Sequence, residues 1–199
     1  MIKVGLTGCR FSGKDTVAKA FGQIGIPVFE ADTVLKFILN FDIGVNKDIL
    51  EGYGEYVFTG RGGTLDSKHI HTDKDFDRLI DFAEFNLKKT YERFCTDNKN
   101  SLYTIFHSSI LLERKWHEEM DFNISVFAPS SERAARSKMS IAKLESMGEM
   151  NPLSKNNACD FVIHCYQSVL GDSIDQVSKI DRKIVDSVLC QKEFIGEEY

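Results

Sequence analysis

The sequence lacks long apolar runs and has no excess of positive charge. Its apolar stretches fall well short of the roughly 20 residues that a membrane-spanning helix needs, and 30 Asp and Glu residues outnumber 25 Lys and Arg residues. The formal net charge of −5 argues against nucleic acid as a partner, because no basic stripe offsets it. We therefore expect neither a membrane nor a nucleic-acid partner. Local positive charge can still serve a small anionic substrate.

The five cysteines form no C-x-x-C pair, and their number is odd. This pattern disfavours a zinc site or a disulfide framework and favours reduced, mostly buried thiols. Cys9 is expected to be exposed and open to alkylation. Because strand-forming residues begin at once, we expect no signal peptide. We expect a cytoplasmic protein that is a monomer or a small homo-oligomer.

Apolar strand patterns alternate with helical patterns along the 199 residues, enough for one domain with a sizeable core. Buried-type strands are expected near residues 2–6, 28–29, 102–106, 122–128 and 161–163. Such alternation indicates an α/β fold in which helices cover both faces of a parallel sheet. Within this single domain we expect a core of residues 1–43 and 100–199, a helical insertion over about 44–99, and a mobile lid over about 138–157.

A glycine-bounded loop follows the first strand and precedes a helix, with G-x-x-x-x-G-K at residues 8–14. The glycines let the backbone turn its N–H groups inward into an anion nest. The helix that begins near Lys14 directs the positive end of its dipole to the same point, and Lys14 adds a mobile charge for the outer phosphates. We interpret the loop as a nucleoside triphosphate site. Its predicted cofactor-binding residues are Gly8, Cys9, Arg10, Phe11, Ser12, Gly13, Lys14, Asp15 and Thr16.

Asp15 departs from the usual pattern of this loop. A Ser or Thr normally follows the lysine, and its hydroxyl ligates Mg²⁺. A carboxylate in this place can hold Mg²⁺ directly or through water, although without the metal it repels phosphate. Thr16 can supply the hydroxyl instead. Asp15 and Thr16 are therefore the predicted metal ligands, with ATP and Mg²⁺ as the cofactors.

Two further side chains follow predicted strands. Asp32 closes the Glu-Ala-Asp triplet after the second strand, and carboxyl ends of parallel strands point into the crevice where ligands bind. Asp32 is thus a candidate catalytic residue, although it can also be only the N-cap of the next helix. His107 follows the third strand, where a lone histidine is more often structural than catalytic.

Taken together, these motifs resemble those of the dephospho-coenzyme A kinases. Landmarks in the order of that family are GLTG…SGK-x-T at residues 5–16, Gly25 before the second strand, the EAD triplet at 30–32, the GTLD turn at 63–66, and an LLE element ending at Glu113. The resemblance covers most of the chain. It implies a three-layer P-loop kinase fold of the nucleoside-monophosphate-kinase type, with a five-stranded parallel sheet, a helical substrate domain and a lid.

The same resemblance implies an activity and assigns roles. The γ-phosphate of ATP would pass to the ribose 3′-hydroxyl of dephospho-CoA. Asp32 matches the general base of the family, and Lys14 belongs to its phosphate cradle. The residues matched to the apolar pair of the substrate pocket and to the basic residue of the lid helix are Ile110, Leu111 and Arg136.

Several positions depart from the family pattern. Glu30 replaces the first Asp of the usual DAD, Ala83-Glu84-Phe85 stands where a His-Pro pair is expected, and Ser109 replaces a Pro. The lid is poor in arginine, although phosphoryl transfer relies on positive charge around the transition state. Either lid lysines substitute, or Arg10 contributes from inside the loop, or the enzyme is slow. Arg10 can equally lie in solvent.

We predict an ATP-dependent small-molecule kinase, with Asp32, Lys14 and Arg136 as its catalytic residues. Asp32 would accept the proton of the acceptor hydroxyl, while Arg136 and one lid lysine would neutralise developing charge. Two alternatives remain at this point. One is a deoxynucleoside monophosphate kinase, which the GKDT loop favours. The other is a nucleotide-binding protein with little or no catalysis, which Asp15 and the arginine-poor lid favour.

Overall fold

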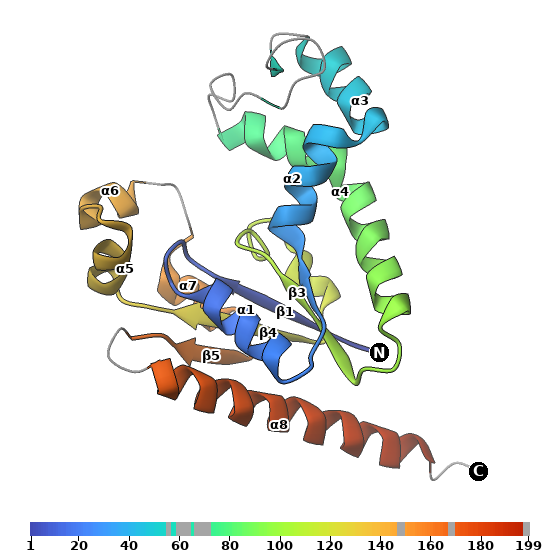
Figure 1. Ribbon diagram of the computed structural model, residues 1–199, viewed down its shortest axis with the longest axis vertical. Helices are drawn as coiled ribbons and strands as arrows, with labels where there is room; N and C mark the ends of the chain where they lie inside the picture. Colours follow the sequence, from blue (N-terminus) through green and yellow to red (C-terminus); the bar gives the residue numbers. More distant parts are fainter. Residues whose placement is uncertain (55–56, 59–64, 66–72, 147–149, 167–169, 197–199) are drawn as a thin grey trace. The chain divides into compact units, whose positions relative to one another are not determined.

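The computed structural model describes residues 1–54, 57–58, 65, 73–146, 150–166 and 170–196. The chain divides into two compact units, Met1–Phe29 with Asn98–Tyr199 and Glu30–Asp97 (Figure 1). The second unit thus begins at Glu30, whereas the insertion was expected to begin near residue 44. None of the helices in the described residues is both long and apolar enough to cross a membrane.

Five strands form one parallel sheet, which confirms the predicted α/β fold. Their order is β2-β3-β1-β4-β5, with β1 in the middle and β3 and β4 on either side of it. Apolar runs of this kind suit strands buried on both faces, and all five residues of β3 are buried. The strands are β1 (Ile2–Gly8), β2 (Val28–Glu30), β3 (Tyr103–His107), β4 (Phe122–Phe127) and β5 (Phe161–His164).

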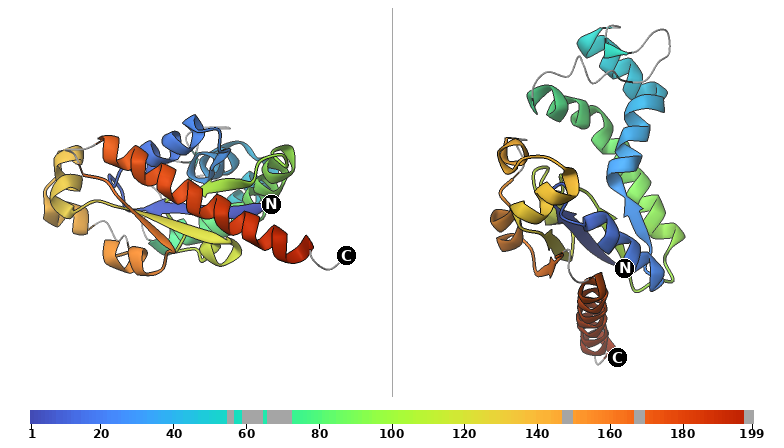
Figure 2. Two further views of the ribbon diagram at one scale, coloured as in Figure 1. Left: turned by 90° about the horizontal axis from the view of Figure 1, so that it is seen from below. Right: turned by 60° about the vertical axis from the view of Figure 1, so that its left-hand side comes forward.

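Alternate residues of β1 pack on opposite faces of the sheet. Val4 and Leu6 lie in one hydrophobic core with residues of α1 (Lys14–Gln23) and α8 (Leu170–Gly196), and Figure 2 shows α8 running along the sheet. Gly5 points the other way, because successive residues of a strand face opposite sides. A Cβ on Gly5 would lie 2.7 Å from Leu111 Cδ2. The segment after β3 therefore packs closely on this second face.

The second unit consists of α2 (Ala31–Phe41), α3 (Ile43–Tyr53) and α4 (Asp73–Asp97). Helix α3 lies within the expected helical insertion, although its glycines weaken the helical pattern. Its end signals are nevertheless in the sequence: Asp42 caps the first turn by accepting from Val45 N–H at 3.0 Å, and Gly54 follows the last residue with φ 86°. The other oxygen of Asp42 accepts from Asn86 Nδ2 at 3.0 Å, which ties α3 to α4.

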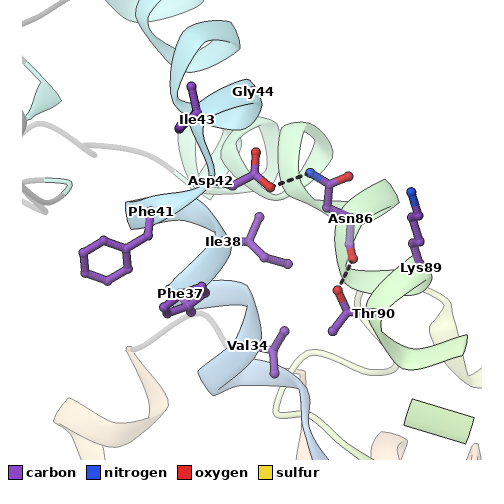
Figure 3. Close-up of a pocket in the computed structure, with 10 residues that line it drawn as sticks. All are labelled: Val34, Phe37, Ile38, Phe41, Asp42, Ile43, Gly44, Asn86, Lys89 and Thr90. Carbon is purple, nitrogen blue, oxygen red and sulfur yellow. Dashed lines mark hydrogen bonds between the residues drawn. The ribbon is translucent and has the colours of Figure 1, made fainter. Parts of the chain in front are cut away.

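Figure 3 shows a cavity of about 650 Å³ within the second unit. Phe37 and Phe41 lie one helical turn apart on α2, with ring centroids 5.1 Å apart, and their side chains are 63% and 60% exposed. Polar side chains come from α4 and from Asp42, the N-cap of α3. The lining residues are Val34, Phe37, Ile38, Phe41, Asp42, Ile43, Gly44, Asn86, Lys89 and Thr90.

The expected lid over residues 138–157 contains two short helices in its described part. They are α6 (Ile141–Glu145) and α7 (Pro152–Asn157), which follow α5 (Ser130–Ser137). Helix α7 packs on β4 and β1, so it belongs to the core. The GTLD turn lies outside the described residues except for Leu65, as do residues 147–149 of the expected lid.

Two single positions also differ from expectation. The apolar spacing of α8 includes Ile174, but this side chain is exposed. Cys9 was expected to be open to alkylation, but it is buried, and its thiol donates to the Met150 carbonyl at 3.5 Å. All five cysteines are free thiols, and Cys9, Cys95 and Cys165 are buried. Three of the five thiols are thus buried, as expected.

Candidate active site

The phosphate loop (residues 8–16) leads from the end of β1 into α1. Ser12 N–H donates to the Cys9 carbonyl at 3.0 Å, and both Phe11 and Gly13 have positive φ, at 63° and 97°. The first intrahelical bonds come from Thr16 N–H and the next residue to the Gly13 carbonyl. The amides just before Thr16 therefore make no backbone hydrogen bond within the described chain, as anion binding at a helix N-terminus requires.

Steric crowding explains both glycines of the loop. A Cβ on Gly8 would lie 2.6 Å from both Ser12 Oγ and the Val126 carbonyl oxygen. At Gly13 it would lie 2.8 Å from Cys165 Sγ, in addition to the strain of a positive φ. The loop is therefore closely seated against the ends of β4 and β5, and only glycine fits at these two points.

Two arginines of α5 hold the carbonyl side of the loop. Arg136 Nη1 donates to the Phe11 and Ser12 carbonyls at 3.0 and 2.9 Å, and its Nη2 donates to the Cys165 carbonyl at 2.8 Å. The buried Arg133 donates from Nε to the Arg10 carbonyl at 2.8 Å. Guanidinium donors thus occupy loop carbonyls, while the amides of Gly13, Lys14 and Asp15 remain for an anion.

Arg136 was predicted as a charge of the lid, and the structure places it against the loop backbone instead. Arg133 received no role from the sequence. Its position in the sequence could have indicated a role. Arg133 lies on the helix that begins just after the carboxyl end of β4, and ligands bind at this edge in such sheets.

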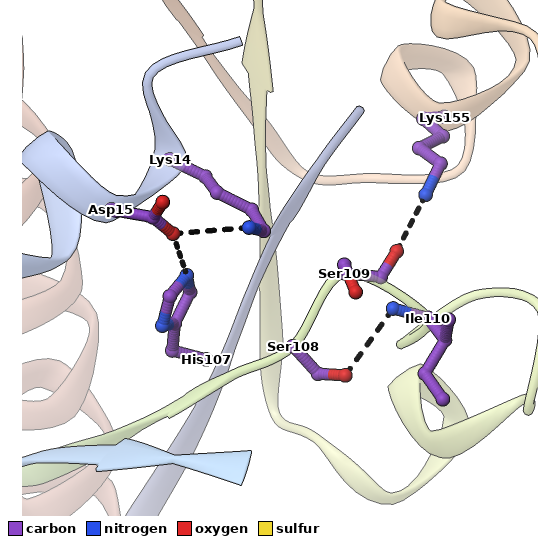
Figure 4. Close-up of polar contacts among 7 residues, drawn as sticks. All are labelled: Lys14, Asp15, His107, Ser108, Ser109, Ile110 and Lys155. Atoms are coloured by element: carbon purple, nitrogen blue, oxygen red, sulfur yellow. Dashed lines mark hydrogen bonds and ion pairs between the residues drawn. The ribbon is translucent and has the colours of Figure 1, made fainter. Parts of the chain in front are cut away.

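Lys14, Asp15 and His107 form a polar cluster at the start of α1 (Figure 4). Lys14 Nζ lies 3.0 Å from Asp15 Oδ1, and His107 Nε2 lies 3.3 Å from the same oxygen. The contact with His107 lowers the pKa of Asp15 far below its usual range. Lys14 lowers it further, and together they outweigh the burial that raises it. The Asp15 side chain is therefore a carboxylate throughout the neutral pH range.

The donors near the loop fit a magnesium ion. Asp15 supplies a hard carboxylate oxygen, and Thr16, one residue on, is exposed. In the described ranges no three His, Cys, Asp or Glu side chains gather as a metal cage. Mg²⁺ commonly takes only one or two carboxylates, together with substrate phosphates and water. One carboxylate beside an anion-binding loop is consistent with this coordination.

A buried lysine fixes the segment after β3. Lys155 of α7 is 1% exposed, and its Nζ lies 2.8 Å from both the Ser109 carbonyl and Glu113 Oε1. It is thus engaged in the core and is not available as a mobile charge. The two other lysines of the expected lid, Lys138 and Lys143, are exposed.

The predicted substrate residues Ile110 and Leu111 differ in access. Ile110 is half-buried, and its N–H donates to Ser108 Oγ at 3.3 Å. Leu111 is fully buried under Gly5. Leu111 therefore shapes the segment without presenting a surface to a substrate, which corrects its predicted contact role.

Asp32 lies in the second unit, in the first turn of α2. The N-cap of that helix is Glu30, and no side chain caps it. The capping explanation of Asp32 is therefore wrong. The half-buried Asp32 sits at the positive end of the α2 dipole.

Comparisons with known proteins point to one enzyme family. A model of the dephospho-CoA kinase family matches residues 2–147. The dephospho-CoA kinase of Aquifex aeolicus is 28% identical over 190 residues, which cover 90% of this chain and 96% of that protein.

Solved structures show the same fold. The Thermus thermophilus protein TT1252 has a TM-score of 0.76 at 19% identity, covering 92% of this chain and 96% of its own. The dephospho-CoA kinase of Campylobacter jejuni has a TM-score of 0.66 at 15% identity, covering 93% and 98%. At these identities the structural likeness concerns the fold alone.

Replacing Arg133 by Met should weaken both the fold and the loop. The change keeps most of the side-chain volume but leaves the Arg10 carbonyl without its donor, at a cost of about 2 kcal/mol in unfolding free energy. We expect a lower melting temperature and an ATP affinity that is lower by about tenfold, measured by calorimetry. Arg182→Met, at an exposed position of α8, is the matched control. Wild-type ATP affinity in Arg133→Met would refute the supporting role of Arg133.

Proposed function

The chain belongs to the dephospho-CoA kinase family of phosphotransferases, and we propose that it transfers the γ-phosphoryl group of ATP to the ribose 3′-hydroxyl of dephospho-CoA. The observation that carries this proposal is the phosphate loop, whose carbonyls at residues 10–12 are held by Arg133 and Arg136 while the amides of Gly13, Lys14 and Asp15 remain for phosphate. The family supplies the acceptor.

ATP binding begins at the amino end of α1. The loop amides and the helix dipole hold the β- and γ-phosphates, and Lys14 exchanges its contact with Asp15 for the phosphate oxygens. The exchange is favourable because the polyphosphate carries more negative charge than one carboxylate. Asp15 and Thr16 are the residues that would hold Mg²⁺, which supplies charge neutralisation on the phosphates when bound.

Asp32 is proposed as the general base. Its carboxylate accepts the proton of the acceptor 3′-hydroxyl as that oxygen forms its bond to the γ-phosphorus, and the bond between the γ-phosphorus and the β,γ-bridging oxygen breaks to release ADP. Positioning and electrostatics supply most of the rate in such transfers. The exposed lysines Lys138 and Lys143 are proposed to close over the transferring group, and Arg136 adds positive charge from beneath the loop.

The cavity of the second unit is proposed to take the pantetheine arm of dephospho-CoA. Large exposed aromatic side chains such as Phe37 and Phe41 are typical of a binding surface. Their apolar faces suit the methylene and dimethyl groups of the arm, and the Asn86 and Thr90 side chains suit its amides. Lys89, on the same side, suits the diphosphate.

The acceptor is tested with purified protein, ATP and a panel of acceptors followed by product mass. Dephospho-CoA should gain one phosphoryl group, whereas deoxynucleoside monophosphates should gain none. Asp32→Asn should lower kcat at least about 100-fold, as expected for loss of a general base, and leave ATP affinity unchanged. Asp48→Asn, at an exposed carboxylate of α3, is the control.

Three results would contradict this assignment. Transfer to a deoxynucleoside monophosphate alone would make the chain a nucleotide kinase. ATP binding with no acceptor phosphorylated would make it a nucleotide-binding protein. Normal transfer by Asp32→Asn would remove Asp32 as the base.

The role of the cavity is tested by Phe37→Ala. Loss of its ring should raise KM for dephospho-CoA about tenfold, because it removes one buried aromatic contact, while KM for ATP stays constant. With adenosine 5′-monophosphate as a poor acceptor that lacks the arm, the variant should match the wild type. Phe76→Ala, an exposed phenylalanine of α4 outside the cavity lining, is the control. An equal effect of Phe37→Ala on both acceptors would show that the arm binds elsewhere.

A further inference from the structure

An imidazole and a carboxylate face each other beside the phosphate loop. His107 is the last residue of β3 and pairs in register with Leu6, two residues before the loop begins. Its Nε2 lies 3.3 Å from Asp15 Oδ1. The histidine side chain is 3% exposed and that of Asp15 is 72% exposed, so a ring fixed in the sheet contacts a carboxylate at the surface.

Both described contacts of the Asp15 carboxylate use the same oxygen. Lys14 Nζ and His107 Nε2 both lie near Oδ1, and Figure 4 shows them approaching it from different elements. The contact of His107 is longer and less well aligned than a regular hydrogen bond. The ring can therefore improve its bond to Oδ1 once Lys14 leaves.

This arrangement addresses a difficulty that Asp15 creates. In most loops of this kind a neutral hydroxyl follows the lysine. A carboxylate there repels the phosphates unless a cation lies between them, and it competes with them for Lys14. The loop therefore works only if Asp15 keeps a partner other than Lys14 and holds an oxygen toward the cation.

We infer that His107 is a positioning residue for phosphoryl transfer, which holds Asp15 Oδ1 through Nε2–H so that Oδ2 receives the cation of the nucleotide while Lys14 moves to the phosphates. The inference rests on the proposed function, because it assumes that ATP binds with its cation at this loop. His107 acts through Asp15 and contacts neither ATP nor the cation.

The first test measures ATP affinity by titration calorimetry, without acceptor, in Mg²⁺ and again in EDTA. The wild type should gain at least about tenfold in affinity from Mg²⁺, as expected for a charge-assisted contact. His107→Leu keeps the volume of the ring and loses the donor, so most of that gain should disappear. His107→Gln keeps an N–H donor and should recover it. His117→Leu, at a half-buried histidine away from the loop, should match the wild type.

Moving the carboxylate from residue 15 to residue 107 gives a second test. Asp15→Ser should bind metal-free ATP more tightly than the wild type, because the repelling carboxylate is gone, and should gain less from Mg²⁺. His107→Asp alone places two carboxylates together and should bind poorly in both buffers. The double variant Asp15→Ser/His107→Asp has one hydroxyl and one carboxylate and should regain the gain from Mg²⁺.

A third measurement separates positioning from direct ligation. The electron spin echo spectrum of Mn²⁺–ATP on the protein should contain no coupling to an imidazole nitrogen, because Asp15 lies between His107 and the ion. Such a coupling would overturn the inference by making His107 a ligand.

The outcomes distinguish this inference from the proposed function. If the wild type binds ATP in neither buffer, the proposed function fails and the role of His107 falls with it. If the wild type responds to Mg²⁺ and His107→Leu responds equally, only the role of His107 is wrong. Equal losses in His107→Leu and His107→Gln would also contradict it, because they would point to packing alone.

Discussion

The two arginines of α5 that bind the carbonyls of the phosphate loop are the interaction on which the rest of the site depends. A short loop with two glycines has many conformations, and only those with the N–H groups turned to one side bind an anion. Arg133 and Arg136 bond the carbonyls of three successive residues, 10–12, which fixes the other side of each peptide. In this way the carboxyl edge of the sheet, where α5 begins, sets the shape of a loop that begins on another strand.

Charge distribution follows from the same geometry. Lys14, Arg133 and Arg136 gather positive charge at the loop of a chain with net charge −5, so a local anion site exists within an acidic protein. Asp15 opposes this field, and its contacts with Lys14 and His107 keep it ionised. On the proposed function, that carboxylate repels metal-free nucleotide and attracts the cation that accompanies the phosphates, so the loop is expected to prefer the metal complex.

Sequence reasoning found the five strands and the phosphate loop because local patterns determine them: buried apolar runs and a fixed spacing of glycines and lysine. It did not find the features that depend on contacts between residues far apart in the sequence. The residues around His107 do not indicate that parallel pairing with β1 brings its side chain to Asp15. Lys155 was expected to be a mobile charge of the lid, but α7 packs into the core and buries it. Phe37 and Phe41 lie off the apolar face of α2, so the helical pattern did not predict that they line a cavity.

The most direct test of the central claim is an amide NMR titration of the protein with MgATP. If the loop amides grip the polyphosphate, the N–H resonances of Gly13, Lys14 and Asp15 should show the largest downfield proton shifts, as expected for new bonds to an anion, and adenosine without phosphates should leave them in place. Unchanged loop amides at saturating MgATP, with the large shifts elsewhere in the chain, would contradict the account.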